Sequence, residues 1–135
     1  MTVRTLQPQG WAKPRGYANG IAAQGTQVYI AGQIGWDGQC RFHSDQFSEQ
    51  VRQALQNVLA VLAEAGGHAE HLVRLTWYIT DRQEYLAELR DVGTAYRAVL
   101  GKHFPAMSVV QVVALMESRA KVEIEAIAVI PDSSR

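Results

Sequence analysis

The chain has 135 residues, and its 13 basic and 13 acidic residues give a formal net charge of zero. This length is sufficient for one domain with an ordinary buried core, and we expect a single domain over residues 1–135. A chain without a basic excess has no field that attracts a polyanion. We therefore expect neither nucleic acid nor an anionic membrane surface as a partner.

Cysteine usage and hydropathy indicate the compartment. Cys40 is the only cysteine, so no intramolecular disulfide can form, and such a chain suits a reducing environment. The first residues, MTVRTLQPQGW, lack the apolar core of a signal peptide, and no apolar run approaches the length of a membrane span. We expect a soluble protein of the cytoplasm.

Short strands are predicted in the first third of the chain. Residues 2–6 alternate weakly and predict a strand, followed by a loop rich in proline and glycine. Two further strands are predicted near 18–23 and 27–31, joined by residues 24–26 in a tight hairpin. Residues 32–35, Gly-Gln-Ile-Gly, then leave the strand. Their glycines would let the backbone approach a ligand closely, although glycine at a strand exit is usually only a turn.

Helical spacing of apolar residues predicts one amphipathic helix over about 44–66. Ser44 or Asp45 is expected to cap its start. The pair Gly66-Gly67 can supply the left-handed residue that ends such a helix.

A strand is predicted over 73–79, followed by a second helix that ends before Gly101. Asp81 is expected to cap this helix, with Glu84 completing a capping box. Gly93 lies in the middle of the helix, where glycine costs about 1 kcal/mol relative to alanine.

The segment from Phe104 to Ile130 predicts a hairpin. Its two runs of β-branched residues, 108–115 and 121–130, are separated by a polar break over 116–120. Alternation along the second run places Glu123 and Glu125 on one face, among apolar neighbours. A carboxylate in this position either lies at a solvated edge or is held there for use.

The element order predicts an α+β fold, with a mostly antiparallel sheet and two helices packed on one face. Two helices cover only one side of such a sheet, yet the last strands are apolar on both sides. An uncovered apolar face of this size indicates oligomerisation. The pattern does not give the number of subunits.

Four segments carry a resemblance to a known family. FPA-x-S-x-x-Q-V over Phe104–Val112 is followed by VEIEAIAV over Val122–Val129, and PRGY at 14–17 and VYIAGQI at 28–34 precede them. The chain resembles the RidA (YjgF/UK114) family of reactive-intermediate deaminases. This resemblance implies a six-stranded sheet of the chorismate-mutase-like RidA fold. It also implies a homotrimer with small-molecule clefts between subunits, and no cofactor or metal.

The resemblance also implies a chemistry: hydrolysis of an enamine or imine made by pyridoxal-phosphate enzymes, giving a 2-oxoacid and ammonia. Glu123 matches the glutamate that positions water in relatives. The substrate-binding residues implied by the resemblance are Tyr17, Ala31, Gly32, Ala106 and Met107.

Met107 stands where the family has an arginine. A methionine cannot pair with a substrate carboxylate, and losing one charged hydrogen-bonding partner costs on the order of 1.5 to 3 kcal/mol. Arg15 or Arg119 could replace it, although each is more often an ordinary surface residue. We expect a more apolar cleft. The alternatives to a deaminase are a non-catalytic trimer that binds a small molecule and a protein-interaction role.

A metal site is not expected. His68 and His71 have no third ligand nearby in the sequence, and we interpret them as solvated.

Overall fold

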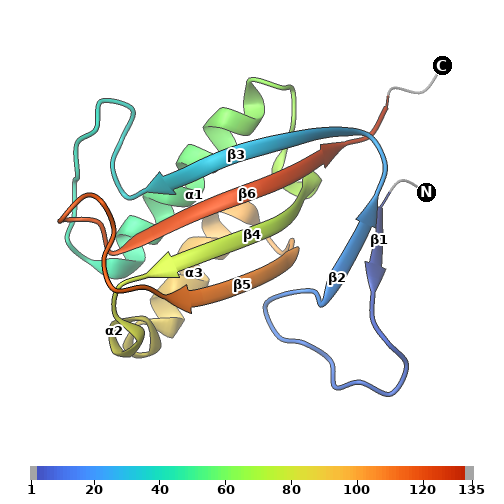
Figure 1. The fold of residues 1–135 in the computed structure, drawn as a ribbon, viewed down its shortest axis with the longest axis horizontal. Coiled ribbons are helices and arrows are strands. Elements are labelled where there is room, and N and C mark those ends of the chain that lie inside the picture. Colours follow the sequence, from blue (N-terminus) through green and yellow to red (C-terminus); the bar gives the residue numbers. More distant parts are fainter. Residues whose placement is uncertain (1–2, 133–135) are drawn as a thin grey trace.

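The structure is a computed structural model that describes residues 3–132. Its strands are β1 (Val3–Leu6), β2 (Gly20–Ala23), β3 (Thr26–Ile34), β4 (Leu72–Ile79), β5 (Ala106–Gln111) and β6 (Val122–Ile130). Its helices are α1 (Phe47–Ala63), α2 (Arg82–Ala87) and α3 (Leu89–Leu100), with a 3₁₀ turn η1 (Ala69–His71). Figure 1 shows α1 and α3 together behind one face of the larger sheet, so the α+β class and the placement of the helices agree with the prediction.

The prediction of one six-stranded, mostly antiparallel sheet is wrong. The strands form a four-stranded sheet in the order β3-β6-β4-β5 and a separate pair, β1-β2 (Figure 1). β6 is antiparallel to both β3 and β4, whereas β5 is parallel to β4. The parallel pair is possible because α2 and α3 form the long crossover between β4 and β5.

The predicted hairpin over 104–130 is also wrong, because β4 lies between β5 and β6. Strand β5 ends at Gln111, and Val113 is fully exposed in the connection that crosses to β6. A run of β-branched residues predicts a strand but does not identify the strand with which it pairs.

Residues 24–26 do not form a hairpin either, since β2 pairs with β1 and β3 pairs with β6. Gly25 has φ 146°, and a Cβ at this residue would overlap the carbonyl oxygen of Ile130. Glycine here lets the chain pass closely over the end of β6.

The two faces of β6 differ as the alternation predicted. Val122, Ile124 and Ala128 are fully buried, and α1 packs against β3 and β6 to form the core. Glu123, Glu125 and Ile127 lie on the other face, which no helix covers in Figure 1. We call this side of the four-stranded sheet the open face.

The start of α1 and the course of the second predicted helix differ from the predictions. Neither Ser44 nor Asp45 is the N-cap of α1; that residue is Gln46, whose side chain makes no capping bond. The second predicted helix is broken at Glu88, whose carboxylate accepts the backbone N–H of Ser48 at 3.0 Å. Glu88 therefore satisfies a free donor in the first turn of α1.

Two other helix-end predictions are confirmed. Asp81 caps α2 by accepting the backbone N–H groups of Gln83 and Glu84. Gly66, at φ 80°, supplies the left-handed residue after α1. The side chain of Glu84 does not close a capping box, because it contacts Lys121 at 2.7 Å.

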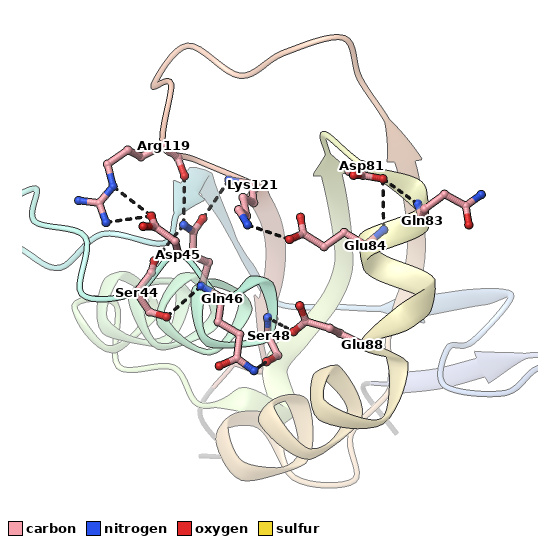
Figure 2. Close-up of polar contacts among 11 residues, drawn as sticks. Ser44, Asp45, Gln46, Ser48, Asp81, Gln83, Glu84, Glu88, Arg119 and Lys121 are labelled. Atoms are coloured by element: carbon pink, nitrogen blue, oxygen red, sulfur yellow. Dashed lines mark hydrogen bonds and ion pairs between the residues drawn. The ribbon is translucent and has the colours of Figure 1, made fainter.

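A polar network joins the start of α1 to the connection before β6 (Figure 2). Gln50, which is 1% exposed, donates to the carbonyl groups of Ser44 and Arg119 and accepts the backbone N–H of Lys121. Arg119 also forms an ion pair with Asp45 at 2.9 Å. These contacts fix the chain two residues before Glu123.

No helix within residues 3–132 is long and apolar enough to cross a membrane.

Replacing Gln50 by alanine should lower the free energy of unfolding by about 2–4 kcal/mol, because three partly buried backbone groups lose their partner. Urea unfolding followed by circular dichroism measures the change. Gln56→Ala, at an exposed position of the same helix, is the matched control and should alter stability little. Equal stability of the two variants would contradict a structural role for the network.

Candidate active site

A pocket of about 530 Å³ opens between α2, α3 and the edge strand β5. We call it the helix-side pocket. The residues that line it include Tyr17, Trp77, Tyr96, Arg97, Phe104 and Met107. Its volume is in the range of small-molecule sites, and most of its wall is apolar or aromatic.

The register of β5 explains why Met107 lies in this pocket. Met107 pairs with Leu75 and Val109 pairs with Trp77, and both partners are buried under the helices. Paired residues of neighbouring strands share a face, so Met107 and Val109 also lie on the helix side. Met107 packs against the core from there.

Tyr17 reaches the same pocket from the loop between β1 and β2. The backbone N–H of Ala18 donates to the carbonyl of Pro105 at 3.0 Å, and Ala18 forms a bridge with Ala106. These contacts hold the loop at the start of β5. Two separate sequence motifs, PRGY and FPA-x-S, therefore meet, and Arg15 lines the pocket with them.

Glu123 lies elsewhere, on the open face. Its carboxylate lies directly over Gly32, where a Cβ would overlap the carboxylate oxygen Oε2. The register of β3 against β6 shifts between Ile30 and Gln33, so Ala31 and Gly32 form a bulge beside Glu123. Glycine at position 32 is needed for space at this close approach.

A second cavity, of about 410 Å³, lies on the open face and is lined by Ala31, Arg74 and Glu125, among others. Ala106 pairs with Arg74 across β5 and β4, which places it on this face too. The predicted site residues thus form two groups. Tyr17 and Met107 line the helix-side pocket, whereas Glu123, Ala31, Gly32 and Ala106 lie on the open face.

The sequence analysis missed polar residues of β4 that share the open face with Glu123. Tyr78 pairs with Glu123, and its hydroxyl donates to Glu125 at 2.6 Å. This hydrogen bond raises the pKa of Tyr78 above its ordinary value. Arg74 donates to Ser108 at 3.5 Å, a long contact. Alternation along 73–79 could have revealed all three positions on β4, since Arg74, Thr76 and Tyr78 are two residues apart.

The two arginines considered as substitutes for position 107 lie in different places. Arg119 pairs with Asp45 and lies over the ring of Phe42, 5.1 Å from its centroid, so its guanidinium is already engaged. Arg15 lines the helix-side pocket, as does Arg97 of α3, which the sequence analysis did not single out. Neither Arg15 nor Arg97 forms an ion pair within residues 3–132.

Buried tyrosines set the polarity of the helix-side pocket. Tyr96 is 5% exposed, and its hydroxyl donates to the carbonyl of His103 at 2.6 Å. Burial raises the pKa of Tyr96 far above its ordinary value and also raises the pKa of Tyr85. Both tyrosine hydroxyl groups are therefore uncharged at physiological pH.

His68 and His71 have a structural role. The ring nitrogen Nδ1 of His71 accepts the backbone N–H of His68 at 2.9 Å, which closes the turn η1. The part of the chain that the structure describes holds no cluster of three or more His, Cys, Asp or Glu residues suited to a metal ion.

Two sequence relatives are named as deaminases. The 2-iminobutanoate/2-iminopropanoate deaminase of Salmonella typhimurium is 35% identical over 116 residues, covering 84% of this chain and 86% of its own. The human protein of the same name is 31% identical, covering 84% of this chain and 79% of its own.

Solved structures agree with the fold. The Rid-family protein YyfB of Yersinia pestis matches with a TM-score of 0.84 at 27% identity, covering 96% of this chain and all of its own. The YjgF protein of E. coli matches with a TM-score of 0.66 at 33% identity, covering 84% of this chain and 87% of its own. The profile of the family described as Endoribonuclease L-PSP matches residues 11–130. The chain therefore belongs to the Endoribonuclease L-PSP family, which includes the RidA (YjgF/UK114) proteins.

Proposed function

We propose that the protein is a hydrolytic deaminase of small imines or enamines, acting as a homotrimer with its sites between subunits. The observation that carries the proposal is the carboxylate of Glu123, which the bulge of β3 holds over Gly32 on the open face. The names of the relatives support the reaction class. That the protein works in the cytoplasm stays a prediction.

Glu123 supplies the base that hydrolysis needs. Its carboxylate accepts a proton from water while the water oxygen bonds to the carbon of the C=N group. The protonated Glu123 returns this proton to the imine nitrogen, and a carbinolamine forms. A second proton then moves from the carbinolamine hydroxyl to the nitrogen, which breaks the C–N bond, releases ammonia and leaves a C=O group. In total, one imine and one water give one 2-oxoacid and one ammonia.

The site needs two subunits because its two parts lie on opposite faces of one sheet. Met107 is on the helix-covered face of β5, whereas Glu123 is on the open face of β6. Glu123 also lies beside the edge strand β3, and the helix-side pocket lies along the opposite edge strand, β5. A contact between the β3 edge of one subunit and the β5 edge of the next is head-to-tail, and such contacts can close into a ring.

Glu123→Gln should slow imine hydrolysis by about a hundredfold or more, because the amide cannot accept the proton of water. The assay follows release of ammonia and 2-oxoacid from imines generated in situ by an amino acid oxidase. Glu125→Gln, two residues away on the same face, is the matched control and should retain most activity. If neither wild type nor Glu123→Gln exceeds the rate without protein, the non-catalytic binding trimer is favoured instead; equal rates above that level would refute the role of Glu123.

Gly32→Ala should reduce turnover strongly while the protein stays folded, because the new methyl group displaces the Glu123 carboxylate. Gly38→Ala serves as the control, since a Cβ at Gly38 meets no atom within 4 Å. Activity and circular dichroism are measured on both variants. Full activity of Gly32→Ala would show that the position of this carboxylate does not matter.

Mixing two inactive variants tests whether the site is shared. Glu123→Gln is combined with Met107→Trp, which fills the helix-side pocket, and the pair is refolded in equal amounts. If each site takes its pocket from one subunit and Glu123 from the next, about one quarter of the sites in random trimers are intact. Activity should return to about that fraction of wild type. A mixture that stays inactive would place the whole site in one chain.

A further inference from the structure

We infer that the helix-side pocket selects substrates with a carboxylate and a large, preferably aromatic, side chain, and that Arg97 holds the carboxylate. This inference deepens the proposed function, because it names the substrate class of the same site. Three observations support the inference: the aromatic wall of the pocket, the charges that line it, and the close approach of the Arg97 guanidinium to Gly93.

Three stacked rings form the wall of the pocket. The ring centroids of Trp77 and Tyr96 are 6.4 Å apart with an interplanar angle of 20°, and those of Tyr96 and Phe104 are 5.2 Å apart at 4°. Trp77 and Tyr96 are almost fully buried in this stack, so it forms a rigid apolar wall against which an apolar or aromatic group packs well. Met107 adds a flexible side chain that adapts to the shape of such a ligand.

The wall also contains an unsatisfied donor. Trp77 is 2% exposed, and its indole Nε1 is a buried side-chain nitrogen without a hydrogen-bond partner in residues 3–132. Buried donors are nearly always paired in proteins, so an unpaired one requires an explanation. Nε1 itself is buried away from the open space of the pocket, so the preference for a ligand rests on the apolar wall and on the arginines.

The charged groups at the pocket all have the same sign. Arg15 and Arg97 line it, and no aspartate or glutamate among the described residues 3–132 does. Since neither arginine forms an ion pair within the described residues, both guanidinium groups remain available to an anion. A carboxylate is the small anion that the planar fork of a guanidinium binds best in two-point contact.

Gly93 gives Arg97 its position. Gly93 has ordinary helical backbone geometry, so the conformation does not require glycine, and glycine is unfavourable inside a helix. A Cβ at Gly93 would lie 3.1 Å from Nη1 and 3.6 Å from Nη2 of Arg97. The missing side chain therefore leaves room for the guanidinium to lie back along α3 at the pocket. Arg97 is the better anchor because a helix holds it, whereas Arg15 is in a loop.

Isothermal titration calorimetry with phenylpyruvate tests this inference on the wild-type protein without any turnover. Phenylpyruvate should bind at least tenfold more tightly than 2-oxobutanoate, which has the same carboxylate but lacks the ring. Arg97→Met should weaken binding of phenylpyruvate by about tenfold to a hundredfold, as expected for the loss of one charged partner. Arg97→Lys should keep part of the wild-type affinity for phenylpyruvate, because lysine keeps the positive charge.

Arg90→Met is the matched control, since Arg90 is exposed on the same helix but does not line the pocket. Gly93→Ala should weaken binding less than Arg97→Met does, without loss of thermal stability, because alanine favours the helix while crowding the guanidinium. Equal affinities of wild type and Arg97→Met, or no preference for the aromatic ligand, would overturn the inference.

The outcomes separate this inference from the proposed function. Tight, Arg97-dependent binding of phenylpyruvate without hydrolysis of any imine would leave the ligand class standing and refute the deaminase. Rapid hydrolysis that depends on Glu123 but prefers small aliphatic imines, and is unchanged in Arg97→Met, would support the deaminase and refute the substrate class.

Discussion

The fold and the candidate site both depend on strand β6, which is paired along both edges and buried on one face. It lies between β3 and β4, and every second side chain from Val122 to Ala128 is buried beneath the helices. A shift of one residue in its register would bring Glu123 into the core and a valine to the open face. The same packing that stabilises the core thus fixes the carboxylate, while the Gln50 network holds the entry to the strand.

Much of the fold could be predicted because its signals are local. Helical spacing identified α1, and alternation identified which residues of β6 are buried. Strand pairing could not be predicted, since the β-branched runs of β5 and β6 fit many partners, and the sheet places β4 between them. The helix break at Glu88 was missed because it depends on Ser48, which is 40 residues away in the sequence.

The candidate site was predictable as a set of residues but not as a geometry. Motif resemblance singled out Tyr17, Met107 and Glu123 together, yet the register of β5 and β6 places the last two on opposite faces. Arg97 belongs to none of the sequence motifs that indicate the family. Its significance emerges only from the fold, which lays α3 along the pocket, and from a glycine one helical turn earlier.

In the site that we propose, the anchoring charge lies on α3 at Arg97 and not on β5 at position 107. A partly buried strand position such as 107 suits methionine well, because no ionised group has to be desolvated there. An arginine on the exposed side of α3 keeps its charge hydrated until a ligand arrives, so the cation costs the folded protein little. The price is an unfavourable glycine in the helix. Under this proposal the charge lies at the rim of the pocket and the interior is apolar, so the bulk of the ligand and not its carboxylate fills the space beside β5.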